Sequence, residues 1–453
     1  MASFDLLPDE ILLKIFSYLG IDDVALSVRN VCTRWSKVSD DDEIWAYLRY
    51  SPNTNDPLEQ IIFMLENMPA LRQFEYTGTC NVIENLCECC RNVSVLHIPC
   101  TTLNATHLQL VMESLTELSD LGILMSPTEE GLKITRIIGQ SVTLACLHLY
   151  SSHEDTTMPG LLKPIADGCP NLVVLECESF NCPTDEICYL LQRKKRQLLT
   201  YDHYGAVTAN FFAALKECTN LKSLSLIAIE IYGLFNESPP AMNLKNLKAL
   251  QISDCRFPTV KIIPLTLFLN TLSHLSYIGI PHTSGNIDVI TNKILLRCPL
   301  LTHLDLGGNE LHCRGLRNIR SCTMLKYLDV SDCTQLGKRA MKYVAEGCPQ
   351  LQHLDVSYIP VSDRMFRQIL RCRNLKELLM KNCDLRPINL GSISTHIDGL
   401  LYLFIGPDYQ LPHYVRDQLK QQMPQLVIAE SPLTCDESEY LRMKDKFIPR
   451  HFW

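Results

Sequence analysis

Reactive side chains are plentiful in this chain, but few of them stand at the spacings that a chemical reaction requires. The 453 residues include 21 cysteines and 13 histidines. Yet the sequence has no glycine-rich phosphate loop, no Gly-x-Ser-x-Gly, no His-Glu-x-x-His and no paired Cys-x-x-Cys. We therefore expect no catalytic residue and no cofactor, and the sequence does not predict an enzyme.

The most concentrated set of potential metal ligands is Cys87-Glu-Cys89-Cys90 together with His97. Its spacing matches none of the common zinc templates. These cysteines also fall at the expected end of a helix, where a small buried thiol is the simpler interpretation. We expect no metal site in the chain.

Charge and hydropathy exclude two classes of partner. The 42 Lys and Arg residues are outnumbered by 50 Asp and Glu residues, which gives a net charge of −8, whereas a general nucleic-acid binder needs a basic field. The first residues lack the features of a signal peptide, and no apolar run approaches the roughly 18 residues that would span a bilayer. We expect reduced thiols in a cytoplasmic and/or nuclear protein with no nucleic acid and no membrane as partner. The basic run at 193–196 indicates either a nuclear import signal or the solvated end of a helix.

The first fifty residues predict a small helical bundle with more apolar side chains than it can bury. Helical spacing extends over residues 6–19, two further short helices are expected at 24–30 and 32–38, and an amphipathic run follows at 43–50. So few residues bury little surface by themselves. The surplus indicates either a helical cap docked on the following domain or a patch that binds a partner.

The same residues carry a family resemblance. The string Leu-Pro-x-Glu-Ile-Leu-x-x-Ile-Phe-Ser-Tyr-Leu at 7–19, then Val-Cys-x-Arg-Trp at 31–35 and Ile-Trp at 44–45, resembles an F-box. The resemblance implies docking of a Skp-type adaptor, which joins such proteins to a cullin–RING ubiquitin ligase. Some of the matching positions must form the internal core of the helices. The adaptor-binding contacts implied by the resemblance are Leu7, Pro8, Ile11, Leu12, Ile15, Phe16, Leu19, Val31, Trp35 and Trp45.

The remaining residues contain a repeat of about 25 residues, with gaps of 22 to 28. Each unit carries the pattern Leu-x-x-Leu-x-Leu, which predicts one short strand followed by a helix that returns to the next parallel strand. One unit cannot bury its own apolar side, so the units must stack. The first apolar positions are Leu71, Val93, Leu118, Leu144, Leu172, Leu198, Leu221, Leu247, Leu275, Leu301, Leu325, Leu351, Leu375 and Leu400.

Many cysteines occupy fixed positions in this repeat. One group stands three positions before the first leucine of its unit, and another group follows the strand at the turn. This arrangement resembles the cysteine-containing class of leucine-rich repeat, in which the thiol is a small buried donor to loop carbonyls. The first group consists of Cys169, Cys218, Cys298, Cys322, Cys348 and Cys372.

The residue between the second and third leucines of each unit should point from the sheet into its concave face. At this row position three successive units carry Asp305, Asp329 and Asp355, which should form a ladder of carboxylates about 4.8 Å apart. Two positions earlier the same units carry His303, Tyr327 and His353, and we assign these six residues to substrate binding. Such a ladder favours a basic partner, although aspartate is also common at this position for structural reasons. The full row reads Glu75, His97, Gly122, His148, Glu176, Asp202, Ser225, Gln251, Gly279, Asp305, Asp329, Asp355, Leu379 and Phe404.

The sequence therefore predicts an α/β protein with an N-terminal three-helix F-box and a leucine-rich-repeat horseshoe, its parallel sheet on the concave face and its helices on the convex face. We divide the chain into an F-box at 1–50, a linker or capping helix at 51–70, about fourteen repeats at 71–429 and a tail at 430–453. The resemblance implies a non-catalytic substrate-recognition subunit of an SCF (Skp–cullin–F-box) E3 ubiquitin ligase, whose repeats hold a target for proteasomal degradation. The alternative is a binding scaffold or inhibitor that degrades nothing. A ligase that carries ubiquitin itself would need an activated cysteine, and the repeat accounts for most of the cysteines.

The tail generates a first testable prediction. Residues 430–453 begin acidic and end basic and aromatic, and a terminal Phe-Trp pair is costly to leave in water. We expect the tail to fold back over the last strand edge, near exposed Leu379 and Phe404, with its cations toward the aspartate ladder. Deletion of residues 440–453 should then lower the melting temperature and speed amide exchange in 375–405. Unchanged values for both would show a free end.

Overall fold

The computed structural model describes residues 7–151, 159–178, 182–205, 208–227, 244–254, 272–283, 286–385, 389–406 and 409–429. The chain divides into two compact units, Met1–Leu198 and Leu199–Trp453, which are described separately. The tail at 430–453, and with it the prediction that the tail folds back, lies outside the described residues.

The first unit begins with the expected helices. They are α1 (Asp9–Phe16), a π-helical turn at Asp23–Ser27, a 3₁₀ turn at Val28–Asn30, α2 (Thr33–Ser39) and α3 (Asp42–Trp45). The amphipathic run at 43–50 is helical only as far as Trp45, because Arg49 and Tyr50 form strand β1 and pair with Gln73 and Phe74. Tyr50 is buried against Phe74, with 5.9 Å between ring centroids, and this packing favours the strand.

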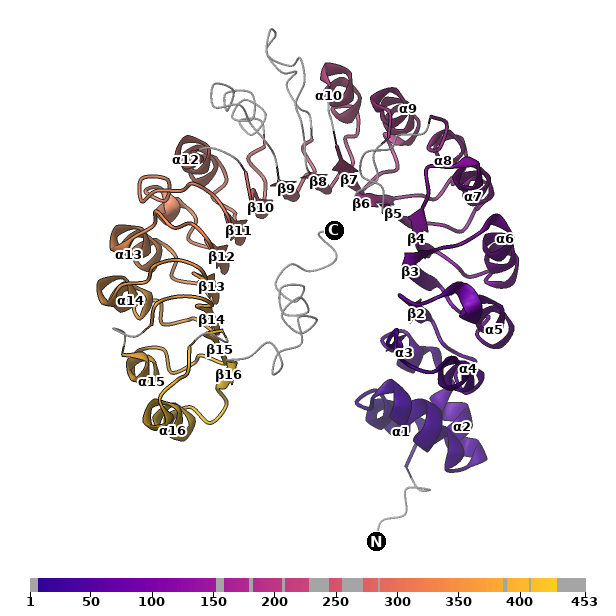
Figure 1. Ribbon diagram of the computed structural model, residues 1–453, viewed down its shortest axis with the longest axis horizontal. Coiled ribbons are helices and arrows are strands. Elements are labelled where there is room, and N and C mark those ends of the chain that lie inside the picture. The colour runs from indigo at the N-terminus through magenta and orange to yellow at the C-terminus, as the bar shows by residue number, and fades with distance from the viewer. Residues whose placement is uncertain are drawn as a thin grey trace. The chain divides into compact units, whose positions relative to one another are not determined.

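Parallel strands in chain order form the sheet of the first unit, and helices cover its outer side (Figure 1). After β1 (Arg49–Tyr50) the strands are β2 (Gln73–Glu75), β3 (Val95–Thr102), β4 (Asp120–Met125), β5 (Cys146–Ser151) and β6 (Val174–Glu178). The helices are α4 (Leu58–Glu66), α5 (Ile83–Cys89), α6 (Ala105–Ser114), α7 (Glu129–Gly139), α8 (Lys163–Asp167) and α9 (Thr184–Lys194).

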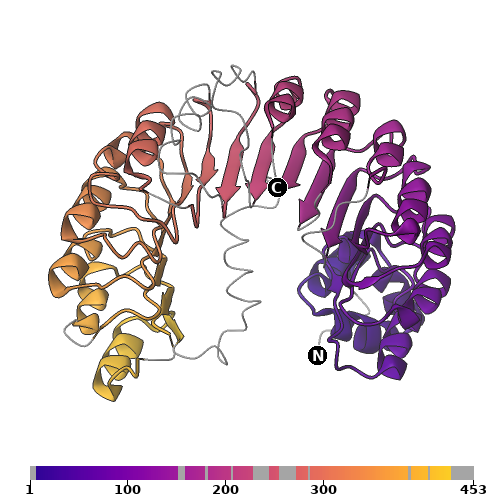
Figure 2. The same cartoon turned by 45° about the horizontal axis from the view of Figure 1, so that its top comes forward.

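The second unit repeats this plan, with its strands side by side and its helices behind them (Figure 2). The strands are β7 (Thr200–Tyr204), β8 (Ser223–Ile227), β9 (Ala249–Ser253), β10 (Tyr277–Gly279), β11 (His303–Asp305), β12 (Tyr327–Asp329), β13 (His353–Asp355), β14 (Glu377–Leu379), β15 (Tyr402–Phe404) and β16 (Val427–Ala429). The helices are α10 (Ala209–Leu215), α12 (Asp288–Arg297), α13 (Lys338–Gly347), α14 (Asp363–Ile369), α15 (Ile393–His396) and α16 (His413–Gln422).

The core of each unit lies between its strands and its helices, as the leucine pattern predicts. All fourteen first apolar positions of the repeat, from Leu71 to Leu400, are at most 2% exposed. A leucine or valine buried to this degree contributes about 1.5–3 kcal/mol relative to an exposed one. The predicted α/β class and leucine-rich-repeat arrangement are therefore confirmed within each unit.

The turns after β9 to β14 each contain one residue in the left-handed region. Three positions after the row residue, φ is positive at Asp254, His282, Gly308, Asp332, Tyr358 and Asn382. Glycine is required at 308, because a Cβ there would lie 2.1 Å from Nδ1 of His282.

The described cysteines are free thiols, and most of them are buried. The predicted bonds to loop carbonyls are present: Sγ of Cys169 donates to Ile138 O at 3.1 Å, and Sγ of Cys298 donates to Leu272 O at 3.2 Å. Burial raises the pKa of Cys372 to about 12, so this thiol stays protonated at neutral pH.

The basic run at 193–196 is only partly solvated. Lys194 is 3% exposed, and its ammonium group donates to the carbonyls of Gly168 and Cys169 at the end of the preceding turn. Arg193 is exposed and pairs with Asp167 at 3.2 Å. A buried central lysine favours the structural interpretation of this run. Among the described residues, no helix is both long enough and apolar enough to cross a membrane.

Burial of the thiols predicts their reactivity. In the native protein a thiol reagent should label exposed Cys32 and Cys100, whereas Cys169, Cys322 and Cys348 should react only after denaturation. Peptide mapping of the labelled protein measures this difference. A reducing agent should leave the melting temperature unchanged, and a large fall on reduction would contradict the free-thiol assignment.

Candidate functional site

The F-box helices divide the ten predicted adaptor contacts into three groups. Leu12, Phe16 and Trp45 are at most 1% exposed and belong to the internal core, so they cannot contact an adaptor in this arrangement. Leu7, Leu19 and Trp35 are half-buried. The exposed contacts are Pro8, Ile11, Ile15 and Val31, with exposed fractions of 44% for Ile11, 38% for Ile15 and 58% for Val31.

On helix α1 the buried and the exposed predicted contacts lie on opposite faces. Residues four apart lie on one face of a helix, so Leu12 and Phe16 face the core while Ile11 and Ile15 lie together on the outside. Phe16 packs against Trp35, with 5.1 Å between ring centroids. Sequence spacing alone could not distinguish the two pairs, because both have helical periodicity.

The end of the F-box region docks onto the first strand of the array. Nη2 of Arg72 lies 2.6 Å from Oδ1 of Asp42, and Nε2 of Gln73 donates to Ala46 O at 2.7 Å. The indole N–H of Trp45 is satisfied internally by Ser39 O at 2.7 Å. The last residues of the region therefore dock it on the array as a cap, while the apolar side chains of Ile11, Ile15 and Val31 remain exposed.

Strand register confirms the predicted row along the inner face of the second unit. Asp305, Asp329 and Asp355 are register partners on β11, β12 and β13. The flanking residues His303, Tyr327 and His353 are partners too, and their rings stack with centroid separations of 5.8 and 4.2 Å. All six predicted substrate-binding residues therefore lie together on one face.

The carboxylates of this ladder are buried, whereas the sequence predicts that they project into an open groove. Asp305 is 5% exposed, and Asp329 and Asp355 are each 2% exposed. Each accepts a hydrogen bond through Oδ1 from the backbone N–H two residues later, at 2.8 to 3.0 Å, and so fixes the turn after its own strand. Of the six residues, only His303 is half-buried.

Burial has an electrostatic consequence at the end of the ladder. Burial and, after it, the neighbouring charge of Asp329 outweigh the hydrogen bonds from Ser357 and together raise the pKa of Asp355 to about 6. At neutral pH the charged form of Asp355 is therefore unfavourable, because it is buried beside Asp329.

Leu379 and Phe404 were expected to be exposed beyond the ladder, and this expectation is wrong. They are 3% and 9% exposed and form one apolar cluster with Tyr402 and Ala429 on the last strands. Apolar side chains in register on adjacent strands bury one another, which sequence spacing alone did not reveal.

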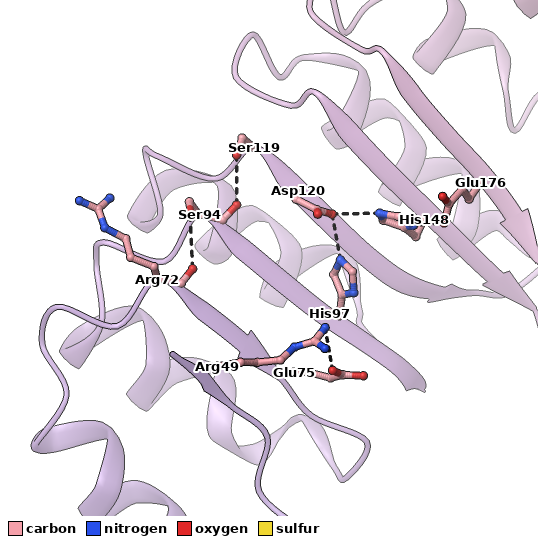
Figure 3. A network of polar contacts seen from close by, with 9 residues as sticks. All are labelled: Arg49, Arg72, Glu75, Ser94, His97, Ser119, Asp120, His148 and Glu176. Carbon is pink, nitrogen blue, oxygen red and sulfur yellow. Dashed lines mark hydrogen bonds and ion pairs between the residues drawn. The ribbon is translucent and has the colours of Figure 1, made fainter. Parts of the chain in front are cut away.

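A second polar row lies on the inner face of the first unit (Figure 3). Nε2 of His97 is 2.8 Å from Oδ1 of Asp120, and Nε2 of His148 is 3.1 Å from the same oxygen. Nδ1 of His148 lies 2.5 Å from Oε2 of Glu176. At the start of the row, Arg49 pairs with Glu75 at 2.8 Å.

The charges of this network support one another. Burial would raise the pKa of Asp120, but hydrogen bonds from His148 and His97 hold it well below its usual range. Burial would likewise lower the pKa of His148, but hydrogen bonds to Asp120 and Glu176 outweigh it and raise the pKa to about 10. In the state described, His148 is a cation between two carboxylates.

The sequence row included His97, His148 and Glu176 but missed Asp120, which stands two positions before Gly122. Gly122 lies between His97 and His148 in the row and has no side chain. This gap could have indicated that the side chain of a nearby residue, here Asp120, occupies the space between the two histidines. His97 turns toward Asp120 on the sheet face, whereas Sγ of Cys90 donates to Leu65 O and Met68 O. The cysteines at 87–90 and His97 are therefore not brought together.

Comparisons with known families agree with this geometry. The F-box-like family profile matches residues 4–51, and a leucine-rich-repeat profile matches residues 297–319 and 321–345. The chain has the architecture of an F-box/leucine-rich-repeat protein. This combination is that of a protein-interaction adaptor, and both domains are typical of non-enzymatic interaction modules. No curated protein matches the chain.

The solved structures that match this chain are distant from it. An internalin from Listeria monocytogenes is 15% identical, with 90% of this chain and 93% of that chain covered, at a TM-score of 0.37. A leucine-rich-repeat protein of Leptospira interrogans is 16% identical, with coverages of 90% and 97% and a TM-score of 0.33. The TLR13–ssRNA13 complex is 15% identical, with coverages of 85% and 54% and a TM-score of 0.39. The fold assignment rests on strand register and the repeat itself.

The raised pKa of Asp355 predicts a pH-dependent stability difference. A carboxyl whose pKa is higher in the folded state favours folding at acid pH, and this contribution is lost as the pH rises through about 6. Asp355→Asn removes the charge and keeps an acceptor for Ser357. The melting temperature of the variant relative to the natural protein should therefore be higher, by a few degrees, at pH 7.5 than at pH 4.

Thermal unfolding at both pH values measures this effect. The control is Asp398→Asn, which neutralises an exposed carboxylate in the same unit and should show the same relative melting temperature at both pH values. A difference for Asp355→Asn that does not change with pH would contradict the prediction.

Proposed function

We propose that this protein is a substrate-recognition subunit of an SCF-type ubiquitin ligase. The observation that carries the proposal is the exposure of three apolar side chains, Ile11, Ile15 and Val31, within an F-box-like segment. An unpartnered apolar surface of this kind is costly in water and is characteristic of an interface. A Skp-type adaptor is the partner that an F-box fits.

The remainder of the chain supports a scaffolding role. The F-box region is tied to β2 by the Arg72–Asp42 ion pair, the Gln73–Ala46 hydrogen bond and the pairing of β1 with β2. An adaptor bound to α1 would thus be joined to the repeats of the first unit by a structured connection. Such a subunit accelerates ubiquitin transfer by proximity, since it holds a target near the loaded conjugating enzyme.

We place target recognition on the inner faces of the sheets. In the second unit His303 is the half-buried member of a stack of rings whose other two members, Tyr327 and His353, are buried behind the face, so His303 is the ring that a target could contact. Asp305, Asp329 and Asp355 lie beside these rings and give the face negative charge, which favours a basic target. We propose that the protein acts in the cytoplasm or nucleus, where its free thiols stay reduced.

Adaptor binding should depend on the outer face of α1. The double substitution Ile11→Glu, Ile15→Glu places two charges in the proposed interface and should abolish copurification of a Skp-type adaptor. Because both side chains are exposed, the melting temperature should stay within a few degrees of that of the natural protein. Pull-down from cells together with thermal unfolding of the purified protein measures both quantities.

A matched control is Leu296→Glu, which charges an exposed leucine on α12 in the second unit. It should leave adaptor binding intact. Full adaptor binding by the double variant would contradict the assignment of the F-box surface.

Ligase function needs a separate measurement. The natural protein, isolated from cells whose proteasome is blocked, should bring down a cullin with the adaptor and should accumulate ubiquitinated targets. Adaptor binding without cullin and without ubiquitinated targets would instead identify a binding scaffold or inhibitor.

A further inference from the structure

Three side chains of the first unit converge on one point of its inner face (Figure 3). They are His97 on β3, Asp120 on β4 and His148 on β5. One nitrogen or oxygen of each lies within 4.8 Å of the others. The three are half-buried, with side-chain exposures of 14%, 25% and 14%, so the point where they meet is both shielded and reachable from solvent.

Strand register explains the convergence. His97, Gly122 and His148 are partners across three adjacent strands, so the two histidines stand on either side of a residue without a side chain. Asp120, two positions before Gly122 on the same face, reaches diagonally into that space. A Cβ at position 122 would come within 2.9 Å of the His97 ring and displace it. Glycine therefore permits the arrangement.

A fourth residue orients one of the histidines. Oε2 of Glu176 lies 2.5 Å from Nδ1 of His148, so that ring nitrogen donates to the carboxylate and Nε2 is aimed at the meeting point. A carboxylate behind the imidazole is the usual support of a metal-binding histidine, because it fixes the ring and increases the basicity of the ligating nitrogen.

We propose that His97 Nε2, Asp120 Oδ1 and His148 Nε2 bind a zinc ion. Imidazole and carboxylate are zinc ligands, and two histidines with one carboxylate leave a fourth tetrahedral position for water or for a donor from a bound protein. At zinc–ligand bonds of about 2.0–2.1 Å the ligands of a tetrahedral ion are about 3.3 Å apart. The separations from Asp120 Oδ1, 2.8 and 3.1 Å, are within a few tenths of an ångström of this value. The two histidine nitrogens lie within 4.8 Å of each other, so binding would draw the two rings together by up to about 1.5 Å.

Charge balance supports the same ion. A bound zinc ion would displace the Nε2 proton that His148 carries in the state described. The imidazoles are then neutral, and the two positive charges of zinc equal the negative charges of Asp120 and Glu176, while Arg49 neutralises Glu75 next to the cluster. The rival explanation is a structural network of hydrogen bonds and ion pairs with no metal. The zinc proposal does not depend on the proposed ligase function, since the F-box residues take no part in the cluster.

The test is zinc binding by the full-length protein after chelator treatment and removal of the chelator. The natural protein should bind one zinc ion with a Kd of about 1 µM or lower in competition with a chromogenic chelator. His148→Gln and Asp120→Asn should abolish this binding, and Glu176→Gln should weaken it about 10- to 100-fold. Gly122→Ala keeps every ligand atom but should also weaken binding, because it displaces the His97 ring.

Two controls separate this site from other zinc-binding side chains. His107→Gln changes a histidine of α6 outside the cluster and should bind zinc like the natural protein. Cobalt(II) in place of zinc should give the visible spectrum of a tetrahedral ion without a sulfur charge-transfer band, which distinguishes the cluster from the cysteines. Circular dichroism of each variant confirms that loss of binding does not reflect unfolding.

The proposal is overturned by any of three results. They are no zinc binding near micromolar concentrations, unchanged binding in His148→Gln and Asp120→Asn, or sulfur ligation in the cobalt spectrum. The first result would leave the cluster as a metal-free polar network.

Discussion

Parallel register between neighbouring repeats is the constraint on which the rest of each unit depends. Many of the strands are only three residues long, so a single strand has few hydrogen bonds and one repeat cannot bury its own leucines. Stacking supplies both, because each strand pairs with the next and each first leucine is enclosed by its neighbours. The same stacking places equivalent residues of successive repeats about 4.8 Å apart, so the chemistry of the inner face belongs to rows of residues.

Two rows show how this spacing can be used in opposite ways. In the second unit three aspartates occupy successive row positions, and each accepts a hydrogen bond from its own turn, which offsets part of the cost of burying like charges together. In the first unit carboxylates and imidazoles alternate from Asp120 through His148 to Glu176, so each group stabilises the next. The aspartate side chains bond to the backbone of their own turns, whereas the side chains of the alternating row bond to one another.

The F-box surface depends on a different constraint, the two faces of one short helix. Leu12 and Phe16 hold α1 to the bundle, and Ile11 and Ile15 lie on the opposite, exposed face of the helix. The last residues of the bundle contact β2 through the Gln73–Ala46 hydrogen bond and the pairing of β1 with β2. This division suits the proposed interaction role, since one end of the region is bonded to the array and the outer face of α1 stays exposed.

The sequence by itself determined the class of fold and the order of its parts. The leucine period predicts every strand from β2 to β15, because a burial pattern that recurs every 25 residues or so has few physical solutions. It also predicts the row partners correctly, from Glu75 through Glu176 and from Asp202 through Phe404, since register follows from equal spacing to each leucine. The buried cysteines and the F-box helices follow from similar local patterns.

Only the tertiary structure decided which of these residues are accessible and which of them meet. Helical spacing is the same for Leu12 and Ile11, yet one is core and the other surface, because the difference depends on what packs against α1. Asp305, Asp329 and Asp355 occupy the predicted row but are buried, since side-chain direction alone does not determine exposure. The approach of Asp120 to His97 and His148 crosses strands diagonally over Gly122 and depends on a missing side chain. Contacts of this kind arise from three-dimensional packing between residues more than twenty positions apart, and a linear pattern does not encode them.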